Sequence, residues 1–271
     1  MNKFFIKPLR QRLATLFISR SDIDRWVKDW NFFFILGMGR SGTSFMADFL
    51  DHASGAHVFH EPVLEDFYAH ARAHYDSLEA RRYIQGFRRT EIYTRMRNFP
   101  SGIYGETNSL LRCHAEALAV TFPQSTILHI VRDGRDVVRS QVSRGTLTLH
   151  NPFSMSMHPT ATDPWKEKWP GMDRFARLCW FWQEENRRLR LATKQTFQFE
   201  KILAGYDYFA EQVLQPCGIH IEKKEWEATI KTPRNVSKEF TMPKWDQWTA
   251  QQQQTFREIC GAEMEKCGYD F

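Results

Sequence analysis

The segment that decides the fold reads Phe32-Phe33-Phe34-Ile35-Leu36, followed by Gly37-Met38-Gly39-Arg40-Ser41-Gly42-Thr43-Ser44. The apolar run predicts a central strand that is buried on both faces. The apolar stretch from Phe45 to Leu50 predicts a helix directly after the loop. Glycines let consecutive N–H groups turn toward an anion, and the helix N-terminus adds about half a positive charge. Strand, glycine loop and helix together predict a phosphate-binding cradle.

A second element follows the predicted strand Ile127–Val131 and begins Arg132-Asp133-Gly134-Arg135. Asp133 suits the N-cap of a helix, and Ser140 falls about two turns into that helix. In a parallel sheet, ligands bind beyond the carboxyl ends of the strands. Arg132 is therefore expected on the same rim as Arg40, where its fork of donors suits a phosphate. Two phosphate sites on one rim indicate a nucleotide that is phosphorylated at both ends.

The rest of the chain alternates short apolar runs with longer helical stretches, which predicts an α/β fold. We expect a P-loop-like, three-layer domain over residues 31–271, with a mostly parallel sheet between helices. Further strands are predicted at His57–Phe59, Ile103–Gly105 and Phe197–Phe199. Helices are predicted over Glu65–Arg97 with a break near Gly86, over Ser109–Thr121, after Asp133, over Met172–Lys194, and as short helices in the C-terminal third.

Two segments stand outside this pattern. Residues 1–30 begin with five basic residues before any acid, and their apolar residues fall on one helical face. This favours a basic amphipathic helix, either docked on the domain or in peripheral contact with a membrane through residues 1–20. Residues 144–171 contain four prolines and read as a long irregular connection. Such a connection in a compact domain is typical of a lid, here over an acceptor.

Composition narrows the classes of function. With 42% hydrophobic and 25% charged residues, the 271-residue chain is not disordered or collagen-like. A net charge of +5 is too mild to indicate nucleic acid binding. The five cysteines form no C-x-x-C pair, which favours a reducing, cytoplasmic setting. Two histidine pairs, His57/His60 and His70/His74, lack the H-E-x-x-H arrangement, so we expect surface or capping histidines and no metal.

The loop and the Arg132 element together resemble the sulfotransferases that use 3′-phosphoadenosine 5′-phosphosulfate (PAPS) and release adenosine 3′,5′-bisphosphate (PAP). The arginine form of the loop is most similar to the tyrosylprotein branch and related bacterial enzymes. Phe199-Glu200-Lys201-Ile202-Leu203, Pro243-Lys244-Trp245 and Cys267-Gly268-Tyr269 are similar to later family segments. The resemblance covers residues 31–271 and implies transfer of a sulfuryl group to an acceptor hydroxyl without a metal.

The resemblance also implies roles for individual residues. Glu61, in His60-Glu61-Pro62, lies where the tyrosylprotein branch places its catalytic glutamate. Arg40 would stabilise the leaving phosphate. Arg132 and Ser140 would hold the 3′-phosphate. The remaining donor-site residues would be Gly39, Ser41, Gly42, Thr43, Ser44, Phe45, Ser237 and Lys238, although Phe45 is equally suited to the core.

Some features leave alternatives open. A second catalytic lysine is common before the Ser109 helix, but the stretch here reads Gly105-Glu106-Thr107-Asn108-Ser109. Glu106 and His60 are alternative bases. A kinase shares the strand–loop–helix cradle, but Thr43 occupies its lysine position. A non-catalytic, bisphosphate-binding module at a membrane surface is a further alternative. The acceptor is expected to be a glycan, a lipid headgroup or a small molecule, with the first two favoured by the basic N-terminus.

Overall fold

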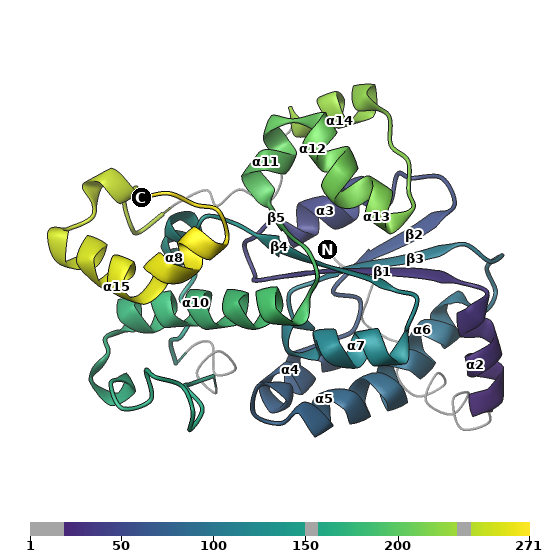
Figure 1. Cartoon of the computed structure of the whole chain (residues 1–271), viewed down its shortest axis with the longest axis horizontal. Coiled ribbons are helices and arrows are strands. Elements are labelled where there is room, and N and C mark those ends of the chain that lie inside the picture. Colours follow the sequence, from purple (N-terminus) through teal and green to yellow (C-terminus); the bar gives the residue numbers. More distant parts are fainter. Residues whose placement is uncertain (1–18, 150–156, 232–239) are drawn as a thin grey trace.

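The computed structural model describes residues 19–149, 157–231 and 240–271. These residues form a five-stranded sheet with helices packed around it (Figure 1). The strands are β1 (Asn31–Gly37), β2 (Ala56–His60), β3 (Ile103–Asn108), β4 (Thr126–Val131) and β5 (Thr196–Gln198). Their order is β2-β3-β1-β4-β5, and every neighbouring pair is parallel. The parallel arrangement brings all carboxyl ends to one edge of the sheet. This confirms the predicted α/β architecture.

Strand β1 occupies the centre of the sheet because both of its faces are apolar. Phe33 and Ile35 belong to the core on one face, and Phe32, Phe34 and Leu36 belong to the core on the other. Alternate side chains of a strand point to opposite faces, so a continuous apolar run suits a strand that is covered on both. Packing on both faces therefore fixes the position of β1, and with it the start of the loop that follows Gly37.

Helices cover both faces of the sheet (Figure 1). On one face lie α3 (Thr43–Leu50) and the helices from α11 (Phe199–Ala204) to α14 (Lys223–Ile230). On the other face lie the helices from α4 (Glu65–Tyr75) to α7 (Ala115–Thr121) and α10 (Arg174–Ala192), and α15 (Ala250–Lys266) packs against α10. The helices are α2 (Arg20–Lys28), α3 (Thr43–Leu50), α4 (Glu65–Tyr75), α5 (Ser77–Tyr83), α6 (Arg89–Met96), α7 (Ala115–Thr121), α8 (Gly134–Ser143), α10 (Arg174–Ala192), α11 (Phe199–Ala204), α12 (Tyr206–Phe209), α13 (Gln215–Cys217), α14 (Lys223–Ile230) and α15 (Ala250–Lys266), with π-helical turns at Ile84–Arg88 and Ala210–Leu214 and 3₁₀ turns at Arg112–His114, Trp169–Gly171 and Trp245–Gln247.

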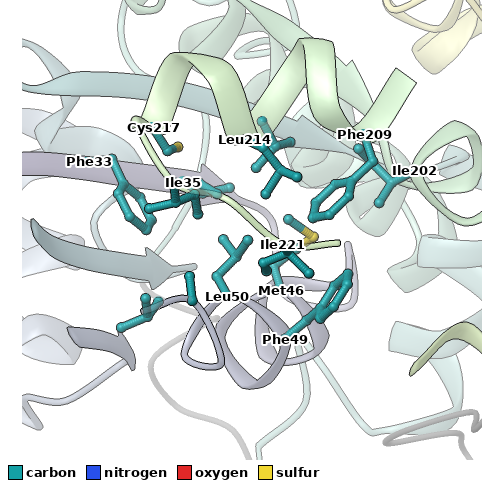
Figure 2. Packing of buried hydrophobic residues seen from close by; sticks show 14 of the residues in the cluster. Phe33, Ile35, Met46, Phe49, Leu50, Ile202, Phe209, Leu214, Cys217 and Ile221 are labelled. Atoms are coloured by element: carbon teal, nitrogen blue, oxygen red, sulfur yellow. The ribbon is translucent and has the colours of Figure 1, made fainter. Parts of the chain in front are cut away.

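The core on the α3 face anchors the helix that follows the glycine loop. Figure 2 shows Met46, Phe49 and Leu50 of α3 beside Phe33 and Ile35 of β1. Side chains from the part of the chain after β5 close the cluster, among them Ile202, Phe209, Leu214, Cys217 and Ile221. Burying one such side chain contributes roughly 1.5–3 kcal/mol. This packing holds the N-terminus of α3 at the carboxyl edge of the sheet.

Three of the helix predictions differ from the structure. The break in Glu65–Arg97 falls at Asp76, whose side chain accepts a hydrogen bond from Leu78 N at 2.8 Å and caps α5. Gly86 lies instead within a π-helical turn. The Ser109 helix starts later, because Asn108 Oδ1 accepts from Leu110 N and Leu111 N and holds a turn there. The C-terminal third contains the 17-residue helix α15 besides short helices.

Of the predicted N-terminal helical segment 1–30, residues 1–18 lie outside the described residues. The neighbouring helix α2 is described, and its Trp26 packs against Phe32 and Tyr93 with ring centroids 5.8 and 5.4 Å apart. Helix α2 is therefore docked on the sheet domain. Among the helices that the structure describes, none combines the length and the apolar character that crossing a bilayer requires.

Part of the irregular segment 144–171 is also described. Met157 is only 2% exposed, and Trp169 contacts Trp180 of α10 with ring centroids 4.8 Å apart. Trp180 and Trp182 are fully buried, as expected for core side chains. The described ends of the segment are thus packed against the domain, while residues 150–156 lie outside the described residues.

Candidate functional site

The glycine loop connects β1 to α3 with two residues in the left-handed region, Arg40 (φ 81°) and Gly42 (φ 95°). Gly42 is the N-cap of α3, and no side chain of the described residues caps this helix end. A Cβ at Gly42 would stand 2.4 Å from the Phe199 ring, so the position also requires glycine sterically. Loops of this kind leave N–H groups and the positive end of the helix dipole directed at a ligand. The loop therefore suits a phosphate or sulfate group.

Arg40, Arg132 and Ser140 lie together at the carboxyl edge of the sheet. Arg132 follows the end of β4, and its Nη1 donates to the backbone oxygen of Arg40 at 3.2 Å. Arg40 Nε donates to Ser140 Oγ at 3.0 Å, across to helix α8. Asp133 caps α8 by accepting from Arg135 N at 2.9 Å, as the sequence predicts. The two predicted phosphate sites are therefore contiguous, with the Arg40 side chain between the loop and α8.

The electrostatics of this edge favour an anion. Burial lowers the pKa of Arg40, and the nearby charges of Arg144 and Arg132 lower it further. The pKa of Arg40 falls because bringing guanidinium groups together disfavours their charged forms. An anion bound here would relieve this repulsion. Arg132 also lies over the Phe199 ring at 5.6 Å and pairs with Asp136 at 3.2 Å, which fixes its direction.

Glu61 stands just beyond β2, close to the glycine loop. Its backbone is in the left-handed region (φ 44°), which is uncommon for a residue other than glycine. One carboxylate oxygen accepts hydrogen bonds from Ser109 N, at 3.2 Å, and from Ser109 Oγ. The same oxygen lies 3.8 Å from His60 Nε2, which in turn is 3.2 Å from Thr43 Oγ1. Glu61 and His60 are thus held side by side at the start of α3.

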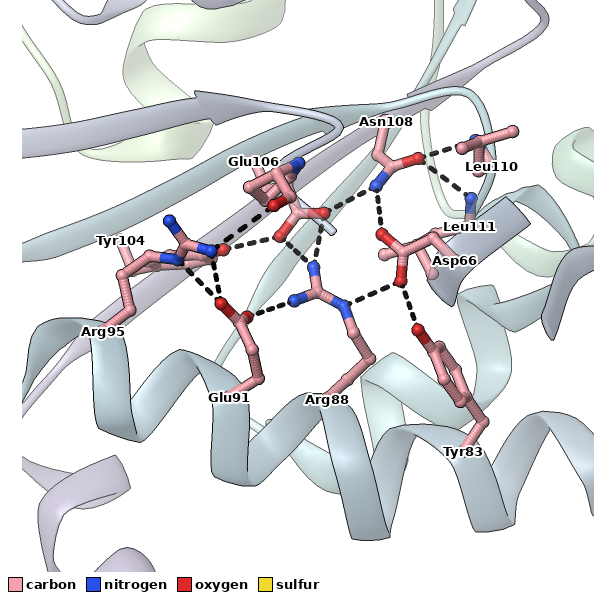
Figure 3. Close-up of polar contacts among 11 residues, drawn as sticks. Asp66, Tyr83, Arg88, Glu91, Arg95, Tyr104, Glu106, Asn108, Leu110 and Leu111 are labelled. Carbon is pink, nitrogen blue, oxygen red and sulfur yellow. Dashed lines mark hydrogen bonds and ion pairs between the residues drawn. The ribbon is translucent and has the colours of Figure 1, made fainter. Parts of the chain in front are cut away.

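Glu106, the other alternative base, is fully buried in a polar network (Figure 3). Both of its carboxylate oxygens accept from Arg88 Nη2, at 2.6 and 2.5 Å. Tyr104 Oη and Asn108 Nδ2 donate to it as well, at 2.6 and 2.7 Å. Its lone pairs are used within the protein and no water reaches it. Glu106 therefore has a structural role in the core below the carboxyl edge of the sheet and is not accessible to a ligand.

The same network includes Asp66, which pairs with Arg88 Nε at 3.0 Å. Burial raises the pKa of Asp66 to about 7, although the charge of Arg88 opposes this. Burial also acts against the charged form of Arg88, but Glu106 and Asp66 hold the pKa of the guanidinium well above its ordinary value. One arginine thus ties α4 and β3 together below the site.

A pocket of about 210 Å³ opens beside the loop. Gly39 and Arg40 of the loop line it together with Ser109, which contacts Glu61, and the C-terminal end of α8 contributes Gln141 and Arg144. The remaining lining residues are Phe67, His70, Ala71, Leu110, Arg112, Thr146, Met157 and Phe181. A molecule in this pocket would lie against the loop that holds Arg40. Ser109, Arg112 and Arg144 were not predicted as site residues, although Arg144 falls one helical turn after Ser140.

Three potential metal ligands, His70, Cys113 and Glu185, have donor atoms within 4.8 Å of one another. Arg112 donates to Glu185 Oε2 at 2.5 Å and to His70 Nε2 at 2.9 Å. Since the guanidinium uses the lone pairs that a metal would need, the group forms an ion-pair cluster. His70 and His74 are 6% and 3% exposed, so the expectation of surface histidines is wrong for this pair. Burial lowers the pKa of His70 well below its ordinary value.

The other predicted residues have mixed placements. Gly39 lines the pocket, and Ser41 and Thr43 are buried in the loop and the first turn of α3. Ser44 follows in the same turn and is partly exposed. Phe45 packs in the core against Phe199, with ring centroids 5.8 Å apart. Ser237 and Lys238 lie outside the described residues.

A family model described as "Sulfotransferase family" matches residues 33–223. No curated protein matches the chain.

Three solved structures resemble the chain weakly. The sulfotransferase domain from the curacin biosynthetic pathway is 12% identical, with 72% of this chain and 76% of that one covered and a TM-score of 0.46. Sulfotransferase STF1 from Mycobacterium tuberculosis is 12% identical over 93% and 84%, with a TM-score of 0.43. Mouse sulfotransferase SULT7A1 complexed with PAP is 14% identical over 92% and 90%, with a TM-score of 0.44. The family assignment rests on the family model.

Proposed function

Because this chain belongs to the sulfotransferase family, we propose that it transfers a sulfuryl group from PAPS to an acceptor hydroxyl and releases PAP. One observation carries the proposal for the donor. Arg40 contacts both Arg132 and Ser140 beside the N-terminus of α3, which no side chain of the described residues caps. This edge offers cations and N–H groups to two neighbouring anionic groups, which is what a nucleotide phosphorylated at both ends requires.

The donor would lie along this edge. The N–H groups from Gly42 to Ser44 would hold the 5′-phosphosulfate, aided by the dipole of α3. The N–H of Ser41 is not available for this, because it donates to the backbone oxygen of Met38 at 3.0 Å. Arg132 and Ser140 would hold the 3′-phosphate, and we assign Ser237 and Lys238 to the same donor site. Arginine is well suited to this because its planar fork of donors matches phosphate oxygens. These backbone N–H groups, arginines and serine residues thus fit the anionic groups of PAPS, and none of them needs a metal ion to bind a phosphate.

The reaction would be an in-line displacement at sulfur. The acceptor oxygen forms a bond to sulfur while the bond from sulfur to the bridging oxygen breaks, and the electron pair stays on the 5′-phosphate of PAP. Arg40 would stabilise the charge that grows on this leaving phosphate, an interaction that lowers the barrier because it strengthens in the transition state. Glu61 would accept the proton of the attacking hydroxyl. Its hydrogen bond with Ser109, which lines the pocket, holds the Glu61 carboxylate beside the pocket.

The pocket beside the loop is our candidate for the acceptor. Arg144, Thr146 and Met157 belong to the segment 144–171 and line it, which supports a role of this segment as an acceptor loop or lid. A hydroxyl in the pocket would meet Gly39, Arg40 and Ser109. We propose an acceptor from glycans, lipid headgroups or small molecules, in a cytoplasmic setting, with residues 1–20 as an additional membrane contact.

Replacing Arg132 by alanine tests the donor assignment. We expect the dissociation constant for PAP to rise roughly 10- to 100-fold, because hydrogen bonds to charged groups contribute about 1.5–3 kcal/mol each. Isothermal titration with PAP measures this directly. Arg135→Ala is the matched control, since Arg135 belongs to the same motif but pairs with Asp133 at 2.6 Å. Its affinity for PAP should stay within about twofold. Equal affinities of Arg132→Ala and the wild type would remove Arg132 from the donor site.

A further inference from the structure

The lining of the pocket beside the loop has an unusual balance of charge. It contains three arginines, Arg40, Arg112 and Arg144, and the histidine His70, yet no carboxylate of the described residues lines it. The rest of the surface is mostly apolar, with Phe67, Leu110, Met157 and Phe181. A cavity with this lining favours a ligand that combines an apolar face with negative charge.

Two of the three arginines already have defined roles. Arg112 is 6% exposed, and it donates to Glu185 at 2.5 Å and to the backbone oxygen of Ser109. Its charge is therefore compensated by Glu185. Arg40 belongs to the proposed donor site, where the leaving phosphate would compensate it. Neither cation remains to attract a charge on the acceptor.

Arg144 is different. It is exposed at the C-terminal end of α8, and no ion pair joins it to a carboxylate of the described residues. The charge of Arg144 acts on the glycine loop: after burial, it is the largest cause of the lowered pKa of Arg40. Gln141, one turn earlier on α8, is 4% exposed, and its Oε1 has no hydrogen-bond partner among the described residues. The pocket thus holds one uncompensated cation and one unused acceptor atom on the same helix end.

We propose that the acceptor is a small hydroxylated ring that carries its own negative charge, with Arg144 binding that charge. The proposal rests on the proposed sulfuryl transfer and names its class of acceptor. The apolar side chains would pack against the face of the ring, and Gln141 would accept a hydrogen bond from a ring hydroxyl. At about 210 Å³ the pocket is smaller than a typical drug-sized site, so it suits a single ring better than a chain.

Matched acceptor pairs test the proposal. Methyl glucuronide is compared with methyl glucoside, and 4-hydroxyphenylacetate with 4-hydroxyphenylacetamide, by transfer of ³⁵S from labelled PAPS. We expect kcat/KM to favour the charged member of at least one pair by roughly tenfold or more, as one charge-assisted contact does. In Arg144→Gln this preference should fall at least tenfold. Lys166→Gln removes an exposed cation from the same segment outside the pocket, so it should keep the preference.

Binding measurements separate this proposal from the proposed function. Calorimetry of the four probes, with and without PAP, reports on the pocket even without turnover. Tighter binding of a charged member that Arg144→Gln weakens supports the proposal, whereas equal binding within both pairs, or no binding of any probe, overturns it. A loss of PAP affinity in Arg144→Gln as large as that in Arg132→Ala also overturns it, because Arg144 would then serve the donor. Failure of the wild type to bind PAP would contradict the proposed function alone.

Discussion

Glu61→Gln should lower kcat for sulfuryl transfer by about 10²- to 10⁴-fold and leave the dissociation constant for PAP within about twofold of the wild type. Glutamine keeps the size of the side chain and can still accept from Ser109, whose N lies 3.2 Å from the carboxylate. It cannot take a proton from the acceptor hydroxyl. Single-turnover transfer of ³⁵S, with PAP titration on the same preparations, measures both quantities.

His60→Gln is the companion variant, because His60 lies 3.8 Å from the Glu61 carboxylate and is the alternative base. If Glu61 is the base, His60→Gln should cost much less turnover than Glu61→Gln. Near-normal turnover of Glu61→Gln together with a large loss in His60→Gln would transfer the role to the histidine. The buried Glu106 is a poor candidate, since Arg88, Tyr104 and Asn108 already occupy its oxygens.

Arg88→Met should lower the free energy of unfolding by about 3–5 kcal/mol, because removing one partner of a buried ion pair leaves its charge uncompensated. Arg88 is fully buried between Glu106 and Asp66 (Figure 3). Methionine fills much of the same volume but leaves both carboxyl groups without a cation. Urea unfolding, followed by circular dichroism at constant pH, measures the change from the shift of the midpoint.

Arg82→Met is the matched control for this variant. Arg82 pairs with Glu79 at 2.8 Å, three residues earlier, just as Arg88 pairs with Glu91 three residues later at 2.5 Å. The Arg82 side chain is 73% exposed, however, and exposed pairs contribute at most about 1 kcal/mol. Similar losses of stability in the two variants would contradict a stabilising role of the buried ion pairs of Arg88.

The sequence predicts the part of the fold that local patterns encode. The run Phe32–Leu36 is apolar at every position, so a strand covered on both faces was predictable. The glycine loop and Asp133 are local sequence signals, and they predicted the phosphate-binding cradle and the N-cap of α8 respectively. Parallel strands then place Arg40 and Arg132 on one rim, as the contact between them requires.

Most of the features that the sequence did not predict depend on tertiary contacts. Nothing local distinguishes Arg88, which is buried, from Arg82, which is exposed, since both lie on the same helical stretch. The predicted break near Gly86 is wrong because a π-helical turn accommodates the glycine. The break at Asp76 does not depend on tertiary contacts, since a local side-chain cap makes it. The pocket combines Arg40, Arg112 and Arg144, which are distant in sequence and line one cavity only after folding.

A crystal structure of the protein with bound PAP tests the central claim most directly. We expect the 5′-phosphate within about 3 Å of the N–H groups of Gly42 to Ser44, and the 3′-phosphate at the same distance from Arg132 and Ser140. Arg40 should lie between the two. PAP bound away from the glycine loop, or bound there with its 3′-phosphate out of reach of Arg132, would contradict the account.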